Sequence, residues 1–198
     1  MIETIRNAWK IPELRKKILF TVFALLIFRL GSVVPVPFID SNMLGATLNN
    51  MGGIFTLLGA MNGTAFSMAA VFALGVQPYI NSSIIIQLLT VAIPALERLQ
   101  KEGGEEGRKK IAAITRYVTV AIGLLQGFGY YTLIRTQGGG TMLDTAGLPG
   151  WWAGIVIVLC FTAGSAFVMW LGEQITEFGI GNGISIILFA ASCPAAPA

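Results

Sequence analysis

Four stretches of this chain are apolar over a length that can cross a lipid bilayer, and this feature limits its fold more than any other. They cover residues 18–36, 66–93, 111–134 and 151–171. About 20 apolar residues in a helix span the hydrocarbon core of a membrane. Only 12% of the whole chain is charged, against about 25% in soluble domains. Because backbone groups in lipid must bond within their own segment, the sequence predicts an all-α integral membrane protein.

The second of these stretches is unusual because it combines apolar length with polar side chains. ALGVQPYINSSIIIQLL (73–89) holds Pro78 in the expected middle of the helix and the polar residues Gln77, Asn81, Ser82, Ser83 and Gln87. Such groups are costly in hydrocarbon unless they face protein or water, and a mid-helix proline frees a carbonyl. At about 100° per residue, one side carries Val76, Ile80, Ser83 and Gln87, with Ile84 at its edge. This pattern fits a narrow apolar constriction in a wet path and, equally well, a helix packed inside a bundle.

The remaining segments are predicted from their helix breakers and charges. Residues 1–17 form an amphipathic, basic N-terminus, and the prolines at 35 and 37 end the first span. Within 37–65, the apolar piece 54–61 is too short to span and is bounded by glycines, so we expect a re-entrant half helix. Residues 94–110, 135–150 and 172–183 are expected to be loops. The last apolar run, 184–192, gives only about 14 Å of helix before the atypical tail 193–198, so the chain is expected to be cut short within a fifth span.

Basic residues lie overwhelmingly on one side of the expected membrane. Eleven of the 13 Lys and Arg residues fall within 1–17 and 95–116, and cytoplasmic segments carry such an excess. The prediction is a multi-pass protein with a cytoplasmic N-terminus, with 94–110 and 172–183 inside the cell and 37–65 and 135–150 outside. Arg29 falls within the first span, where snorkelling, pairing with another helix and contact with water all remain open.

The sequence argues against catalytic and metal chemistry. There is no histidine, which removes most zinc sites and His-dependent triads, and Cys160 and Cys193 form no metal motif. Ser165 has no histidine or lysine at membrane depth to activate it, so helix packing explains it better. Glu173 and Glu177 fit a solvated face rather than an acid–base pair. We expect no enzyme, cofactor or metal; a secondary transporter, which also uses broken helices, stays an alternative although no acidic residue lies at membrane depth.

Several long blocks carry a resemblance to a known family. They are ALGVQPYINSSIIIQLL (73–89), RLQKEGGEEGRKKI (98–111), TRY (115–117) and MWLGEQITEFGIGNGISIILFA (169–190), together with FRLGSVVPVP (28–37) and GGIFTLLGA (52–60). In this order they resemble the SecY family, the channel subunits of the bacterial Sec protein translocon, from about residue 10 to Ala190. The resemblance implies the N-terminal five-helix half of an inverted-repeat translocon channel with an hourglass pore.

The same resemblance implies roles for individual residues. Val76 and Ile80 match pore-ring positions on the second helix, and Ile184 and Leu188 match those on the fifth. The half helix resembles the plug that fills the outer funnel, with Ile54, Phe55, Leu57, Leu58 and Gly59. Asn81 and Ile84 match one side of the lateral gate, through which membrane helices leave for lipid. Branched aliphatic side chains around a constriction exclude water and ions, yet can part around a polypeptide.

Function and partners follow from the resemblance as expectations. The chain is expected to be half of a protein-conducting channel in the bacterial cytoplasmic (inner) membrane, passing unfolded secretory polypeptides and releasing membrane helices laterally. Expected partners are the SecE and SecG subunits, the SecA motor or a ribosome, signal sequences and nascent polypeptides, the lipid bilayer, and the C-terminal half of the channel. No nucleic acid is expected other than ribosomal RNA. A non-conducting scaffold half, which only packs against partners, is the alternative for the isolated chain.

Overall fold

The computed structural model of the chain describes residues 12–40, 53, 64–101, 103–137 and 149–192. Within these ranges the regular elements are helices: α2 (Pro12–Gly31), α5 (Thr64–Ser67), α6 (Gln77–Ala92), α7 (Pro94–Lys101), α8 (Gly104–Gln137), α9 (Gly150–Phe178) and α10 (Gly183–Ser192). The predicted all-α fold is confirmed. Of the described helices, α8 and α9 are long and apolar enough to cross a membrane.

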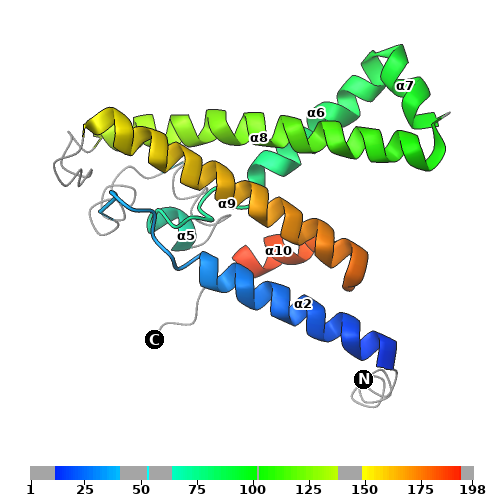
Figure 1. Cartoon of the computed structure of the whole chain (residues 1–198), viewed down its shortest axis with the longest axis horizontal. Helices are drawn as coiled ribbons and strands as arrows, with labels where there is room; N and C mark the ends of the chain where they lie inside the picture. Colours follow the sequence, from blue (N-terminus) through cyan, green and yellow to red (C-terminus); the bar gives the residue numbers. More distant parts are fainter. Residues whose placement is uncertain (1–11, 41–52, 54–63, 102, 138–148, 193–198) are drawn as a thin grey trace.

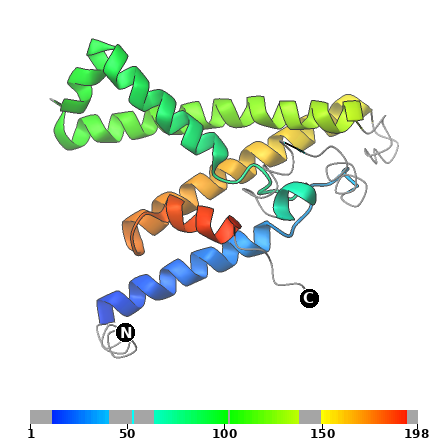
Figure 2. The ribbon, with the colours of Figure 1, turned by 180° about the vertical axis from the view of Figure 1, so that it is seen from behind.

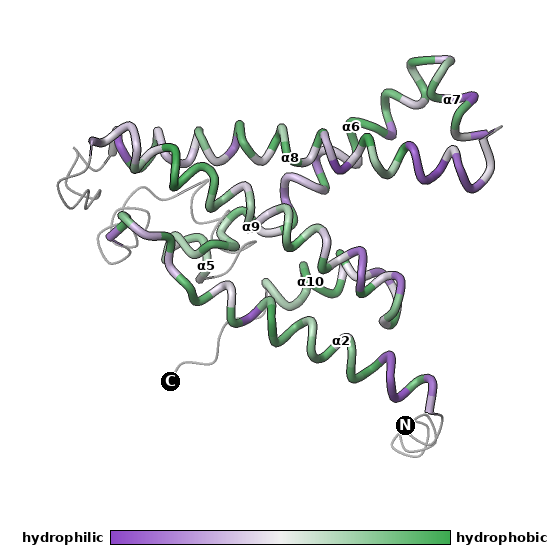
Figure 3. The backbone as a smooth tube through the Cα atoms, viewed as in Figure 1, coloured by the Kyte–Doolittle hydropathy of each residue, from purple (hydrophilic) through white to green (hydrophobic). Residues whose placement is uncertain are grey.

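The helices form an open arrangement around α9. This helix packs against α8 on one side and against α10 and α2 on the other (Figure 1). α6, α7 and the first turns of α8 form a helical hairpin at one end of the molecule, as the reverse view also shows (Figure 2). The hydrophilic residues of this hairpin lie at the same end as those of the start of α2 and the end of α9 (Figure 3). The molecule therefore has one strongly polar end, with apolar helix bodies leading away from it.

The second expected span, 66–93, is not a single helix. α5 ends at Ser67, residues 68–76 form turns, and α6 begins only at Gln77. Positive φ angles at Ala69 (48°) and Gly75 (51°) interrupt the helical path. Pro78 consequently lies in the first turn of α6, where its missing N–H would have had no intrahelical partner. The prediction that Pro78 frees a mid-helix carbonyl is therefore wrong.

The backbone of the turn segment 68–76 bonds to the segment that follows α2. α2 runs from Pro12 to Gly31, so the first helix both begins and ends several residues before the expected 18–36. The N–H of Val36 donates to the carbonyl of Ala69 at 3.0 Å, and the N–H of Val71 donates to that of Val34 at 2.9 Å. Val36 and Ala69 are fully buried, so an unpaired backbone group there would be costly. Two non-helical segments thus satisfy each other inside the protein.

Two of the expected loops are largely helical. Residues 94–110 form α7 and the first turns of α8. α6 ends just before Pro94, and Pro94 then opens α7. α9 continues through residue 178, so only 179–182 separate it from α10. The extension follows from packing, because Gly172 and Ile175 are buried beyond the apolar run on which the loop prediction rested. α10 begins at Gly183, one residue before the expected start. The plug residues 54–59, the N-terminal residues 1–11, the tail 193–198 and most of 135–150 lie outside the described residues.

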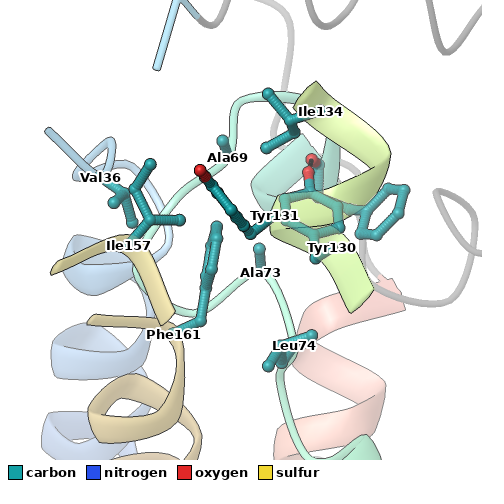
Figure 4. Close-up of a cluster of buried hydrophobic side chains, with 10 residues drawn as sticks. Val36, Ala69, Ala73, Leu74, Tyr130, Tyr131, Ile134, Ile157 and Phe161 are labelled. Carbon is teal, nitrogen blue, oxygen red and sulfur yellow. Dashed lines mark hydrogen bonds between the residues drawn. The ribbon is translucent and has the colours of Figure 1, made fainter. Parts of the chain in front are cut away.

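A buried cluster holds the turn segment against the two long helices (Figure 4). We call it the tyrosine cluster; its buried members are Val36, Phe66, Ala69, Ala73, Leu74, Tyr130, Tyr131, Ile134, Ile157 and Phe161. The Tyr130 hydroxyl donates to the carbonyl of Phe66 at 2.7 Å. The ring of Tyr130 meets that of Phe161 edge-on, with centroids 4.9 Å apart, a favourable aromatic geometry. These contacts join α5, α8 and α9 at the end of the molecule opposite the polar hairpin.

Candidate functional site

A second buried cluster lies where α6 and α10 approach α2 and α9. We call it the α10 cluster; its buried members are Ala24, Phe28, Phe72, Val76, Val168, Leu171, Ile175 and Ile187. Ile80 and Ile184 are partly buried and pack against it. Val76 is only 3% exposed, although it stands at the very start of a helix. Apolar side chains from α2, α9, α10 and the turn segment that leads into α6 therefore close this part of the molecule.

The start of α6 sets the positions of Val76 and Ile80. Val76 is the residue before the helix, and its carbonyl accepts the N–H of Ile80 at 3.1 Å. Gly75 turns the chain with a positive φ of 51° immediately before. Because Ile80 is one helical turn after Val76, both side chains reach the same cluster.

The start of α10 is held against α9 by a close contact between two glycines. A Cβ atom on Gly183 would lie 2.1 Å from the carbonyl oxygen of Gly172. The N–H of Gly183 donates to Oγ1 of Thr176 at 2.9 Å, and the N–H of Ile184 donates to Oδ1 of Asn182 at 3.1 Å. Small residues allow helix backbones to approach in this way. The result places Ile184 beside α9 and within the α10 cluster.

The structure brings together three of the four residues matched to the pore ring. Val76, Ile80 and Ile184 all belong to or pack against the α10 cluster. Leu188 is partly buried one turn further along α10 and, among the described residues, is not one of those packed on this cluster. Ile187, which directly precedes Leu188 in α10, is fully buried in the α10 cluster. Sequence reasoning did not single out Ile187.

The two residues matched to the lateral gate line one shallow groove between α6 and α8. The groove has a volume of about 340 Å³ and is bordered by Asn81, Ile84, Ile85 and Ile122. Ile84 is 50% exposed. On another side of α6, Ser82 is completely buried, and its hydroxyl lies 2.5 Å from that of Thr119 on α8. α6 therefore packs on α8 through Ser82 and leaves an apolar face open beside Asn81.

An ion pair joins α8 to α9 near the polar end of the molecule. Arg116 donates from Nε to Oε1 of Glu173 at 3.0 Å, and its Nη2 lies 2.9 Å from Oε2. The side chains of Arg116 and Glu173 remain 56% and 23% exposed within this pair. Glu177 is exposed as well, so neither carboxylate departs from the expected solvated face. No local spacing predicts a pair 57 residues apart. The one available signal was that the predicted topology puts both residues at the cytoplasmic ends of neighbouring spans.

The helical hairpin carries the charged side chains that sequence reasoning assigned to the cytoplasm. Lys101 donates to Oε1 of Glu97 at 2.6 Å, and this hydrogen bond together with the negative charge of Glu97 raises the pKa of Lys101. Both groups face solvent, so the pair adds little stability. Arg108, Lys109 and Lys110 are exposed on the first turns of α8. Among the described residues, no group of three or more His, Cys, Asp or Glu side chains is placed to hold a metal ion.

Comparison with known proteins decides the family. The family model described as SecY matches residues 70–198. The chain belongs to the SecY family. Proteins named protein translocase subunit SecY from Streptomyces coelicolor, Bacillus subtilis and Escherichia coli are 43%, 41% and 45% identical to it. These matches cover 99%, 96% and 90% of this chain but only 47%, 43% and 40% of the relatives, so the chain spans less than half of their length.

The fold of this SecY-family chain also resembles solved structures. Sec61 in the canine ribosome–channel complex from the endoplasmic reticulum superposes with a TM-score of 0.60 at 17% identity, over 94% of this chain and 40% of that one. A structure described as that of a protein conducting channel gives the same TM-score at 18% identity. At these identities the likeness concerns the fold alone. The resemblance expected from the sequence is confirmed, and a membrane location fits the family.

Proposed function

We propose that this chain forms the N-terminal half of a protein-conducting channel in a bacterial cytoplasmic membrane. The channel would pass unfolded secretory polypeptides across the membrane and release membrane helices sideways into lipid. The observation that carries the proposal is the match to translocase subunits over 90% to 99% of the chain. The α10 cluster supports it further, because side chains from both helices matched to the pore meet there.

The proposed constriction consists of Val76, Ile80, Ile184 and Leu188. The packing of the first three on the α10 cluster supports their assignment, and Leu188 rests on its family position. Aliphatic groups offer water and ions no replacement for a hydration shell, so a closed ring of them is a barrier. They also form no strong polar bonds with a passing chain, so a polypeptide of any sequence can slide through when the ring opens.

The proposed lateral gate is the side of α6 that carries Asn81 and Ile84. Both residues border the groove between α6 and α8, and Ile84 is half exposed. A membrane helix that leaves the channel presents mostly apolar side chains with few polar ones. An isoleucine-lined groove with a single amide suits such a segment, since packing and occasional hydrogen bonds drive helix contacts in lipid.

The proposed orientation puts the helical hairpin in the cytoplasm. Its exposed residues Arg108, Lys109 and Lys110 support this, since basic residues concentrate on that side of membranes. The SecA motor or a ribosome would dock there, with ribosomal RNA the only nucleic acid in contact. The plug, residues 54–59, would fill the outer funnel. SecE, SecG and a C-terminal half of the channel would complete the assembly around the signal sequences and nascent chains that it carries.

The proposal is tested by the resting ion conductance of the complete channel that carries these residues. Replacing both Val76→Gly and Ile80→Gly removes aliphatic surface that would seal the constriction. Because ions would then meet a wider and wetter passage, we expect the resting current across planar bilayers to rise several-fold. Purified channel complex in bilayers of defined composition, without a translocating substrate, provides the measurement.

A matched variant separates sealing from general damage to α6. Ile93→Gly with Val91→Gly changes the same two residue types at the opposite end of α6, where the side chains are 41% and 81% exposed. This variant is expected to leave the resting current unchanged. An unchanged current in the Val76 and Ile80 variant, or an equal rise in both variants, would contradict the proposed constriction.

A further inference from the structure

A deep apolar groove lies between α8 and α9 at the end of the molecule opposite the helical hairpin. Its volume is about 410 Å³. Leu124 and Phe128 of α8 form one wall and Ile155 and Leu159 of α9 the other, all of them at least 40% exposed. Arg135 lies at the mouth of the groove, at the end of α8. We call this the α8–α9 groove.

The depth of the α8–α9 groove comes from a glycine in α9. A Cβ atom on Gly154 would lie 2.7 Å from Cζ of Tyr131, so only a glycine lets the tyrosine ring lie down against the helix. The Tyr131 hydroxyl donates to the carbonyl of Gly150 at 3.3 Å, which keeps the ring in this position. The floor of the groove is therefore built from buried groups that do not need a ligand to be ordered.

The dimensions of the groove fit one lipid tail. From Leu124 to Arg135 α8 rises about 16 Å, which is half of the roughly 30 Å hydrocarbon core and so the depth of one leaflet. A partner helix of about 10 Å diameter fills roughly 400 Å³ per turn, so the groove would receive only about one turn of it. A thin, flexible acyl chain can follow the groove over its whole length.

The mouth of the groove attracts negative charge. Arg135 is exposed there, and α9 begins beside it at Gly150 with no capping bond from a described side chain. A helix N-terminus carries partial positive charge and free N–H donors. Trp151, 65% exposed at the mouth, is of the residue type that marks the level of lipid headgroups.

We infer that the α8–α9 groove binds one anionic phospholipid, with an acyl chain between the two helices and its phosphate on Arg135. The inference rests on the membrane orientation proposed above, which puts Arg135 in the outer leaflet. The site shares no lining residue with the proposed constriction or with the groove of the proposed gate between α6 and α8. Its affinity depends on one ion pair in addition to tail packing, so removal of that charge has a defined effect.

The test uses the complete channel complex in vesicles that contain phosphatidylglycerol or phosphatidylcholine with a photoreactive group in the middle of one tail. Crosslinked peptides located by mass spectrometry are expected to come from 124–135 and 151–159, with phosphatidylglycerol preferred. One basic contact near the headgroups changes lipid affinity about five-fold, so Arg135→Gln should lower this preference by that factor. Leu159→Trp fills the groove from an exposed position and should lower labelling by both lipids.

Lys109→Gln is the charge-matched control, because it removes one exposed positive charge from the opposite end of α8. It should leave labelling of the groove unchanged. Equal labelling by the two lipids, or an unaltered preference in Arg135→Gln, would overturn the inference. If the exposed face of α2 were labelled and the groove were not, a partner helix would cover the groove. That result would overturn the lipid inference but would leave the channel proposal intact. Absence of lipid labelling everywhere would instead contradict the membrane location.

Discussion

The buried hydroxyl pair between α6 and α8 allows a sharp prediction of how little such a contact stabilises the protein. Ser82 and Thr119 are fully buried, and their oxygens lie 2.5 Å apart. Ser82 also lies 2.9 Å from the carbonyl of Tyr79, and Thr119 lies 2.7 Å from that of Thr115. Two hydroxyls have only two hydrogens, so at most two of these three contacts are hydrogen bonds at once.

This count limits the free energy of the interhelical bond. When α6 and α8 separate within a membrane, each hydroxyl keeps the carbonyl of its own helix, so two bonds exist before and after. Ser82→Ala and Thr119→Val should therefore each lower the free energy of unfolding by less than about 1 kcal/mol. Their coupling energy should be near the average of about 0.6 kcal/mol found for polar contacts between membrane helices. A larger side chain should have a greater effect. Ser82→Leu should lower the free energy of unfolding by about 1–3 kcal/mol, because Ser82 is fully buried and the site has no room for added atoms.

The assay is a double-mutant cycle in the intact protein, with unfolding free energies measured in mixed detergent micelles. Ser83→Leu, at the next position and partly exposed, is the control for bulk and should change stability by less than about 0.5 kcal/mol. A coupling energy of about 1.7 kcal/mol or more would refute the reasoning, since the carbonyls of each helix would then be no substitute for the interhelical bond.

Two further predictions concern a buried hydrogen bond between α8 and α5 and a close backbone contact between α10 and α9. Tyr130→Phe removes the hydroxyl that donates to a carbonyl of α5 and should lower the free energy of unfolding by about 1 kcal/mol; Tyr117→Phe, 78% exposed, should change it little. Gly183→Ala puts a methyl group against the backbone of Gly172 and should cost about 1–3 kcal/mol. Gly129→Ala, which meets no atom within 4 Å, should instead stabilise α8 by about 0.5–1 kcal/mol. Thermal unfolding in detergent compares each pair, and equal shifts within either pair would contradict the packing described.

The ion pair between Arg116 and Glu173 shows why some contacts escape sequence reasoning. Arg116 lies in the first turns of one apolar span, and Glu173 follows the end of another. The hydropathy of each span is the same whether or not the two residues pair. Their bond depends on α8 and α9 being neighbours with their polar ends together. Hydropathy and charge place both residues at the cytoplasmic ends of their spans, but they do not say that the two spans pack against each other.

The sequence by itself determined the helical class, the polar end and the identity of the family. These properties depend on the composition of continuous stretches of sequence. Examples are the apolar length of α8 and α9 and the number of basic residues in the helical hairpin. Only the tertiary structure decided that 68–76 leaves the helix and that Val76, Ile80 and Ile184 meet. An apolar stretch read alone is most stable as one continuous helix. Here the segment after α2 offers hydrogen bonds to 69–71. These bonds pair the backbone at the buried residues Val36 and Ala69, so the break in the helix leaves no costly unpaired group there.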